Sequence, residues 1–172
     1  MESKARTRKL VIMALLIALS FVGANITVFG SIAFDSLPAF FAALLLGPVY
    51  GAMIGFLGHM FTAFTSGFPL TAPMHFVIAV SMALTMLCFG CTYRLLKVKA
   101  GVRLLVTGIV GVLLNAPVSL ALSIAALWLM AGREAALGLL ILLPFLVMAS
   151  AVNVFIGIFL FATLEKHWNE LR

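Results

Sequence analysis

The sequence predicts an all-α integral membrane protein, a bundle of six transmembrane helices with both termini in the cytoplasm. Three observations lead to this fold class. The 172-residue chain is 65% hydrophobic and 9% charged, whereas a soluble domain is about half apolar and about a quarter charged. Its apolar stretches are continuous and lack the alternating pattern of a membrane β-barrel. Its basic residues gather near the start, the middle and the end of the chain.

The basic residues predict the orientation in the membrane. The net charge is +6, and only Arg133 lies apart from three basic clusters. Basic clusters flanking membrane helices face the cytoplasm, so both termini are expected inside and the number of crossings is even. The charge is explained by topology, and no nucleic-acid partner is expected. The clusters are Lys4, Arg6, Arg8 and Lys9; Arg94, Lys97, Lys99 and Arg103; Lys166 and Arg172.

The first predicted span covers residues 10–29, about 20 apolar residues, which is enough to cross about 30 Å of hydrocarbon. Its basic flank also fits a signal peptide cleaved near Gly23 and Ala24. Further membrane segments follow directly, so a span is the preferred interpretation.

Residues 33–47 and 49–65 are predicted as the second and third spans, separated by Gly47 and Pro48. The alternative is a re-entrant hairpin over residues 34–65, which leaves the sidedness of the other segments unchanged.

The second half of the chain continues this pattern. Residues 66–73 contain two prolines and a glycine and predict an external loop. Pro117 is expected to kink the fifth span and Pro144 to interrupt the sixth. The remaining spans are residues 75–96, 104–130 and 137–164, so that residues 1–172 form a single transmembrane domain.

Polar residues concentrate toward the predicted outer half. Polar groups at membrane depth are costly and usually face a bundle interior or a wet cavity, so an outward-facing pocket is expected. Asp35 is the one acid in this group; it could bind a ligand, pair with a histidine or cap the following helix. His59 shares a helix face with Thr62, and a structural hydrogen bond to a carbonyl is as good an interpretation as ligand binding.

Motifs for metal binding or catalysis are not found. His59, His75 and Asp35 lack compact ligand spacing, so no metal site is expected. Cys88 and Cys91 have redox spacing but no βαβ context. The sequence has no Walker A, G-x-S-x-G or H-E-x-x-H motif, so no enzymatic activity and no cofactor are expected.

Small residues recur at four-residue spacing in two predicted helices. Gly47, Gly51 and Gly55 continue such a pattern in the third span, where Gly58 follows. Ala14 and Ala18 form one pair in the first. Close helix approach in lipid depends on small side chains, so packing within the chain is the simplest interpretation.

Residues 34–52 resemble the second-helix region of the S components, the substrate-binding membrane subunits of energy-coupling factor (ECF) transporters. In that family a loop leads into a Pro-containing apolar segment, a Gly-Pro-x-x-Gly turn and a Gly-rich third helix, here residues 51–59. Ala14-xxx-Ala18 is similar to the family's first-helix A-x-x-x-A motif. Length, six spans and internal termini also agree, so the resemblance covers essentially the whole chain, and the order and spacing of the motifs make it more specific.

The resemblance implies a six-helix S component in a prokaryotic plasma membrane. Such a subunit captures a vitamin or related micronutrient from outside. It then delivers the ligand to a transmembrane coupling protein and two cytoplasmic ATPases, which hydrolyse the ATP. Ala14 and Ala18 would contact the coupling protein, and residues 30–37 and 66–74 would cap the ligand.

Pocket residues differ among S components, so they are inferred here from position. The expected substrate-binding residues are Asn25, Asp35, His59, Thr62, His75, Asn115 and Asn153. Because no lysine or arginine falls in this set, a neutral, ring-containing ligand is favoured over one bound through a carboxylate or phosphate. The candidates are a cobalamin precursor such as α-ribazole, riboflavin, a pyridine- or thiamine-type vitamin, and pantothenate.

Two other classes of function stay open from the sequence. A stand-alone secondary transporter would need an ion-coupling site, for which Asp35 is the one candidate acid. A membrane-embedded enzyme would have to use His59, His75 and Asp35.

Overall fold

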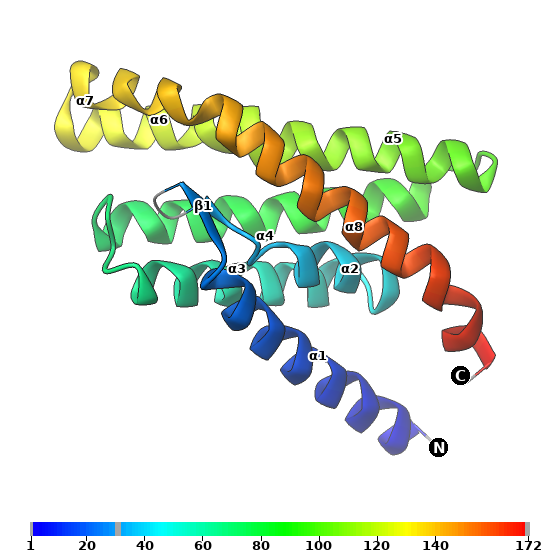
Figure 1. Cartoon of the computed structure of the whole chain (residues 1–172). Coiled ribbons are helices and arrows are strands. Elements are labelled where there is room, and N and C mark those ends of the chain that lie inside the picture. The colour runs from blue at the N-terminus through cyan, green and yellow to red at the C-terminus, as the bar shows by residue number, and fades with distance from the viewer. Residues whose placement is uncertain (1, 30–31, 171–172) are drawn as a thin grey trace.

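The computed structural model describes residues 2–29 and 32–170, which form a helical bundle with one short hairpin (Figure 1). Residues 30 and 31 of the predicted capping loop and Arg172 of the last basic cluster lie outside the described residues. The helices are α1 (Glu2–Ala24), α2 (Leu37–Leu45), α3 (Pro48–Thr65), α4 (Ala72–Leu95), α5 (Ala100–Leu113), α6 (Ser119–Ala131), α7 (Arg133–Gly138) and α8 (Leu143–Glu170). The strands are β1 (Thr27–Phe29) and β2 (Ile32–Ala33).

Two irregular turns join helices into longer segments. The π-helical turn η1 (Leu114–Val118) links α5 to α6, and the 3₁₀ turn η2 (Leu139–Leu142) links α7 to α8. Pro117 lies inside η1, where its missing N–H and its ring disturb regular helical hydrogen bonding. The fifth predicted span is therefore a continuous helical segment in which the winding changes from α to π at the proline.

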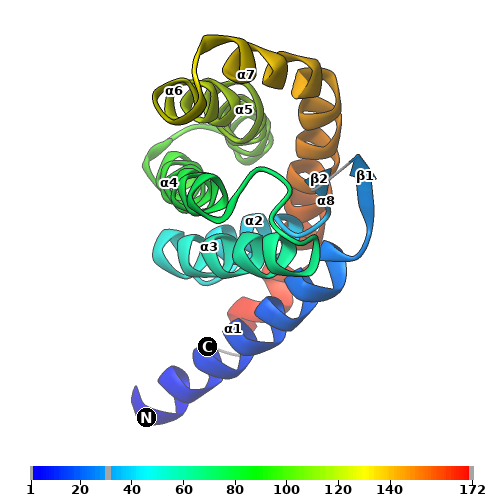
Figure 2. The ribbon, with the colours of Figure 1, turned by 90° about the vertical axis from the view of Figure 1, so that its left-hand side faces the viewer.

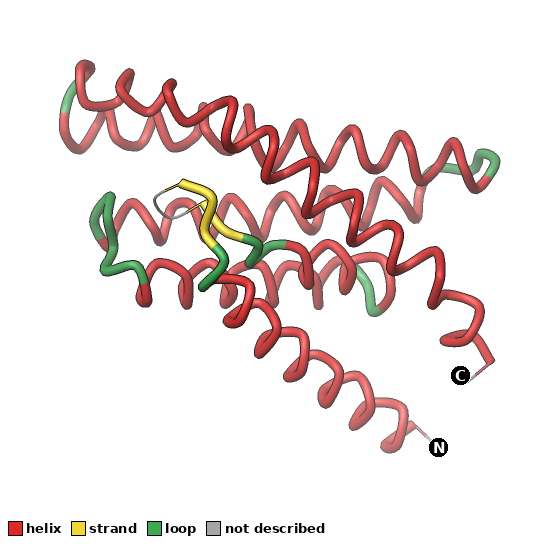
Figure 3. Tube along the Cα trace, in the orientation of Figure 1, coloured by secondary structure: helices red, strands yellow, loops and turns green. Residues whose placement is uncertain are grey.

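The bundle has two distinct ends. The start of α1, the α4–α5 connection and the end of α8 lie toward the right of Figure 1, whereas the α3–α4 loop and the α6–α7 turn lie toward the left. The tube in Figure 3 shows the α3–α4 and α6–α7 connections at one end, the α4–α5 connection at the other, and the hairpin with its flanking loops between them. The described residues of the three basic clusters therefore share the end that carries the start of α1 and the end of α8.

Four helical segments are long and apolar enough to cross a membrane, judged by length and composition within the described residues. They coincide with the first, fourth, fifth and sixth predicted spans, and the number of crossings beyond these four stays a prediction. The segments are Arg6–Ala24, Ala72–Leu95, Ala100–Ala131 and Arg133–Lys166.

The predicted first span, residues 10–29, is too long at its C-terminal end. Helix α1 ends at Ala24, and the chain then forms β1, which pairs antiparallel with β2. The backbone N–H of Phe34 donates to the carbonyl of Gly23 at 3.2 Å, and a Cβ on Gly23 would lie 2.5 Å from the Phe34 carbonyl oxygen. Glycine at this position allows the hairpin to fold back against the helix end.

The second predicted span, residues 33–47, is helical only in part, over Leu37–Leu45. Pairing of β2 delays the start of α2 until Leu37, and the helix stops before Gly47, whose φ of 125° favours glycine. Nine residues of α-helix extend about 13.5 Å, less than half of a hydrocarbon core of about 30 Å. Helix α2 is therefore a half-length helix, joined by a tight turn to the 18-residue α3.

Helix α2 forms the centre of the core. Its residues from Pro38 to Leu45 are all buried, and it packs against α1, α3, α4 and α8. Phe40 meets Phe89 of α4 edge to face, with ring centroids 4.9 Å apart. A short, wholly apolar helix can occupy this place because neighbouring helices shield every face of it.

The glycines of α3 pack within the chain. A Cβ on Gly51 would lie 2.5 Å from the Cβ of Ala43, on Gly55 it would meet Met86, and on Gly58 it would meet Ser20. These three glycines therefore let α3 approach α2, α4 and α1 closely.

The helices arrange themselves around a central space. Figure 2, seen from the left of Figure 1, shows α4 between α3 and the α5–α6 pair, with α8 along the opposite side. The hairpin and the α3–α4 loop lie over this end of the bundle.

Candidate functional site

A cavity lies between α4, the α5–η1–α6 segment, the α7–η2–α8 segment and the start of α2. The cavity has a volume of about 100 Å³. Pockets for small molecules commonly measure about 300–1,000 Å³. The cavity as described is therefore narrower than such pockets, and its walls would have to separate to admit a vitamin-sized molecule.

The lining divides into a polar and an aliphatic part. The aliphatic side chains come from α4, α6, η2 and α8 and include Ile78, Met82, Leu120, Leu142 and Leu146. No aromatic, lysine or arginine side chain lines the cavity in the part of the chain that the structure describes. The polar lining residues are Asp35, Ser36, His59, Asn115, Ser119, Ser123, Ser150 and Asn153.

The acidic end of the cavity is built by Asp35 and three side chains around it. Thr62 Oγ1 donates to Asp35 Oδ2 at 2.7 Å, and His59 Nδ1 lies 3.5 Å from the same oxygen. On its other side, His59 Nε2 lies 3.2 Å from Nδ1 of His75. All four residues are buried, with exposed fractions of 6% or less.

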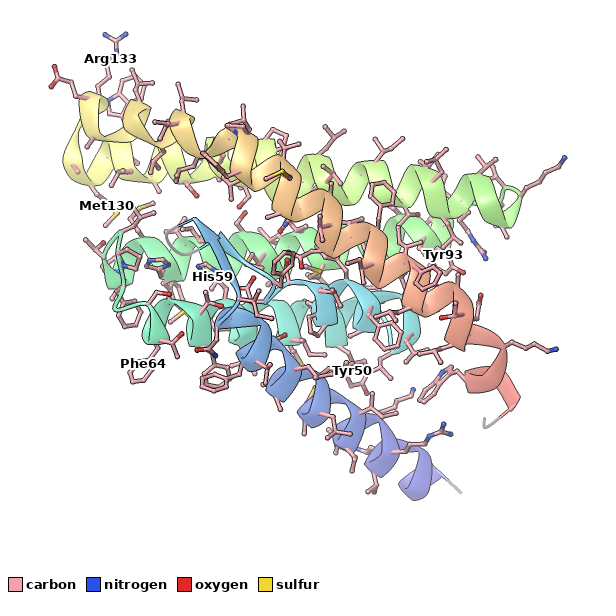
Figure 4. All side chains as sticks on the ribbon, in the orientation of Figure 1. Tyr50, His59, Phe64, Tyr93, Met130 and Arg133 are labelled. Atoms are coloured by element: carbon pink, nitrogen blue, oxygen red, sulfur yellow. The ribbon has the colours of Figure 1, made fainter. Side chains whose placement is uncertain are left out.

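The α3–α4 loop connects to this group through a backbone hydrogen bond. The N–H of Leu70 donates to His75 Nε2 at 3.4 Å, and Leu70 itself lines the cavity. A continuous chain of contacts thus runs from the loop through both histidines to the carboxylate. Figure 4 shows His59 on the side of α3 that faces α4, whereas Phe64 of the same helix points away from the bundle.

The opposite wall presents hydroxyl and amide groups. Asn115 Nδ2 donates to Ser150 Oγ at 3.1 Å, which joins η1 to α8. Ser81 Oγ of α4 donates to Ser119 Oγ at 3.0 Å, and Ser123 Oγ donates to the carbonyl of Ser119 at 2.9 Å. These groups are held in place by one another and can also bind a ligand, because each hydroxyl oxygen both donates and accepts.

Four of the expected substrate-binding residues line the cavity: Asp35, His59, Asn115 and Asn153. Thr62 and His75 lie behind them, fully buried, and contact Asp35 and His59 rather than the cavity. Asn25 does not join the group. Its side chain is exposed and donates to the carbonyl of Phe21 in its own helix at 2.8 Å.

Two open interpretations from the sequence are now resolved. Asp35 does not cap α2, since Ser36 is the N-terminal cap residue and no side-chain hydrogen bond is made there. His59 contacts another histidine and Asp35 rather than a backbone carbonyl.

The serines of the cavity were absent from the expected set. A signal for them exists in the sequence, because Asn115, Ser119 and Ser123 recur every four residues and so share one helix face. Ser150 likewise precedes Asn153 by three residues. Serines are common in membrane helices. The four-residue spacing therefore shows that these side chains share a helix face, but it does not show whether that face contacts lipid, another helix or a cavity.

Within the described residues, no group of three or more His, Cys, Asp or Glu side chains could hold a metal ion. The isolated basic residue Arg133 does not reach the cavity either. Figure 4 shows it at the α6–α7 end, pointing away from the bundle.

The predicted partner-contact residues lie on the surface. Ala14 and Ala18 are both exposed on α1, surrounded by exposed apolar side chains such as Leu15 and Leu19. This face of α1 is left uncovered by the rest of the chain.

Comparison with known proteins gives one match. A family model described as "ECF transporter, substrate-specific component" matches residues 8–165, nearly the whole chain. No curated protein and no solved structure matches the chain.

Proposed function

Because the chain belongs to the family of substrate-specific components of ECF transporters, we propose that its cavity captures a vitamin or related micronutrient from outside the cell. The family membership makes it a membrane-embedded, substrate-binding subunit of a transporter. The finer proposal concerns where the substrate binds, from which side it enters and which partners receive it.

The observation that carries this proposal is the polar cavity inside an apolar bundle. Eight polar residues from five separate segments converge on it, although polar groups at membrane depth are costly. Packing within the chain does not explain why so many polar groups converge on unfilled space. Binding of a ligand with several hydrogen-bonding groups explains this arrangement.

The arrangement of charge supports entry from outside. All three basic clusters belong to the end of the bundle that carries both termini (Figure 1), and such clusters mark the cytoplasmic side. His59 and the α7–α8 segment place the cavity toward the opposite end. Each of the two predicted capping segments contributes a residue to the cavity lining: Leu70 comes from residues 66–74 and Asp35 from residues 30–37.

Delivery would use the partners that the family implies: a transmembrane coupling protein and two cytoplasmic ATPases. The chain carries no nucleotide-binding motif, so the energy must come from those partners. The exposed face of α1 with Ala14 and Ala18 is suited to a close helix contact with the coupling protein.

Native mass spectrometry of the purified protein tests the capture site. We expect one small molecule per chain, and its mass identifies it among α-ribazole, riboflavin, pyridine- or thiamine-type vitamins and pantothenate. Asn115→Leu removes an amide from the cavity wall and should lower the retained fraction.

Asn25→Leu is the matched control, since Asn25 lies outside the cavity. Equal retention by the two variants would place the ligand elsewhere. Full-rate uptake by this chain in vesicles without any ATPase would contradict its role as a capture subunit.

A further inference from the structure

We propose that the substrate is an organic cation and that Asp35 Oδ1 binds its positive charge. This inference rests on the proposed function, because it takes the cavity as the substrate site. It narrows the expected class of ligand, which the sequence alone left as neutral and ring-containing.

The first step is the position of the carboxylate. Asp35 lines the cavity although its side chain is almost completely buried. Both side-chain contacts that hold it, from Thr62 and from His59, end on Oδ2. Among the described residues no side chain contacts Oδ1, so this oxygen is left to interact with a ligand.

For the second step, the hydrogen bond from Leu70 and the contact between the two histidines indicate which ring nitrogens carry protons. Leu70 N–H donates to His75 Nε2, so this nitrogen carries no proton and a neutral His75 has its proton on Nδ1. That proton points to His59 Nε2, which must accept it. A neutral His59 then carries its proton on Nδ1, the atom that faces Asp35 Oδ2.

An extra proton does not fit this arrangement. On His75 Nε2 it would break the hydrogen bond from Leu70, and on His59 Nε2 it would oppose the proton of His75. In this arrangement both histidines donate in the direction of Asp35 Oδ2 and neither brings a positive charge to the carboxyl group.

The third step is the absence of a countercharge nearby. No lysine or arginine lines the cavity among the described residues. Arg133 points away from the bundle, and the basic clusters belong to the other end (Figure 1). An ionised group at membrane depth without a full countercharge is unfavourable.

A positively charged ligand supplies this countercharge. The remaining lining decides what kind of cation fits. Aliphatic side chains and neutral hydroxyl and amide groups suit an organic molecule with an apolar part, and among the described residues no group of three His, Cys, Asp or Glu side chains could hold a bare metal ion. An anionic ligand would be repelled by Asp35.

The test separates small molecules by charge without assuming their identity. A small-molecule filtrate of yeast extract is divided by ion exchange into a cationic, a neutral and an anionic fraction. Each desalted fraction is added to the detergent-purified chain in phosphate buffer, and the thermal unfolding midpoint is measured. We expect the cationic fraction to raise the midpoint and the other two to leave it unchanged.

Asp35→Asn should require about tenfold more of the cationic fraction for the same shift, because a charge-assisted contact is lost. Glu134→Gln, which removes an exposed acid at the α6–α7 turn, should respond like the unchanged chain. The unchanged chain alone decides the charge class, so the test holds even where Asp35→Asn does not fold.

The two proposals fail in different ways. A shift caused by the neutral or anionic fraction overturns the cation and leaves the capture function standing. If no fraction shifts the midpoint and the purified protein retains no small molecule, the capture function fails together with the cation.

Discussion

At the scale of single residues, the main feature is the buried carboxyl group of Asp35 and the side chains that contact it. Asp35 receives the hydroxyl of Thr62 at 2.7 Å, and His59 connects it to His75 and the α3–α4 loop. A hydrogen bond to a charged group contributes about 1.5–3 kcal/mol. The loop that covers the cavity and the group that lines it are therefore linked by hydrogen bonds rather than by packing alone.

Thr62→Val tests this stabilisation. Valine keeps the shape of threonine but removes the donor to Asp35, so we expect the free energy of unfolding in detergent to fall by about 1.5–3 kcal/mol. The matched control is Thr65→Val one turn later, since that exposed hydroxyl donates only to carbonyls of its own helix. An equal loss in both variants would mean that the contact with Asp35 adds nothing.

At the scale of elements, the half-length α2 determines where the site lies. The hairpin of β1 and β2 uses residues that the sequence assigned to flanking spans, so the chain before α2 returns into the bundle and brings Asp35 beside α3. Helix α2 stays buried because α3 approaches it at Gly51, whose Cα hydrogen faces Ala43. The position of Asp35 therefore depends on how closely α2 packs against α3.

Gly51→Ala tests the contact between α2 and α3. The added methyl group would lie 2.5 Å from the Cβ of Ala43, so the helices must separate, and we expect a loss of about 1–3 kcal/mol in the free energy of unfolding. Gly101→Ala is the control, because no atom lies within 4 Å of its added Cβ. If Gly51→Ala and Gly101→Ala unfold at the same temperature, α2 and α3 are less closely packed at Gly51 than the structure shows.

At the scale of the whole molecule, the two ends and the outer faces have separate roles. One end carries the basic clusters and both termini (Figure 1), and the cavity lies toward the other. The surface around α1 is apolar and exposes Ala14 and Ala18. The proposed contact with a coupling protein would use this face, and no described side chain of α1 lines the cavity.

Ala14→Leu combined with Ala18→Leu tests the partner face. We expect the coupling protein to co-purify about tenfold less strongly, as overpacking at a close contact costs about 1–3 kcal/mol, while the retained ligand is unchanged. Ala121→Leu with Ala125→Leu is the matched control, a pair of exposed alanines at the same spacing on α6. Equal co-purification of both double variants would assign the contact to another helix.

Predictability differed between the parts of the site. Asn115 and Asn153 were identified from the sequence because an amide in an apolar helix needs a polar partner. Asn25 was assigned by the same rule, but its position one residue past the end of α1 lets it bond to its own helix. The serines were missed because their preference for one helix face does not say whether that face meets lipid, packing or a cavity.

The sequence by itself determined the membrane class, four long apolar helices, the common end of the basic clusters and the family. These properties depend on composition, period and charge, which are local. Only the tertiary structure decided that α2 is half as long as a crossing needs and that Asp35 meets Thr62, 27 residues away. The physical reason is that strand pairing and close glycine contacts join segments distant in the chain, and their geometry sets where the buried carboxyl group of Asp35 is held.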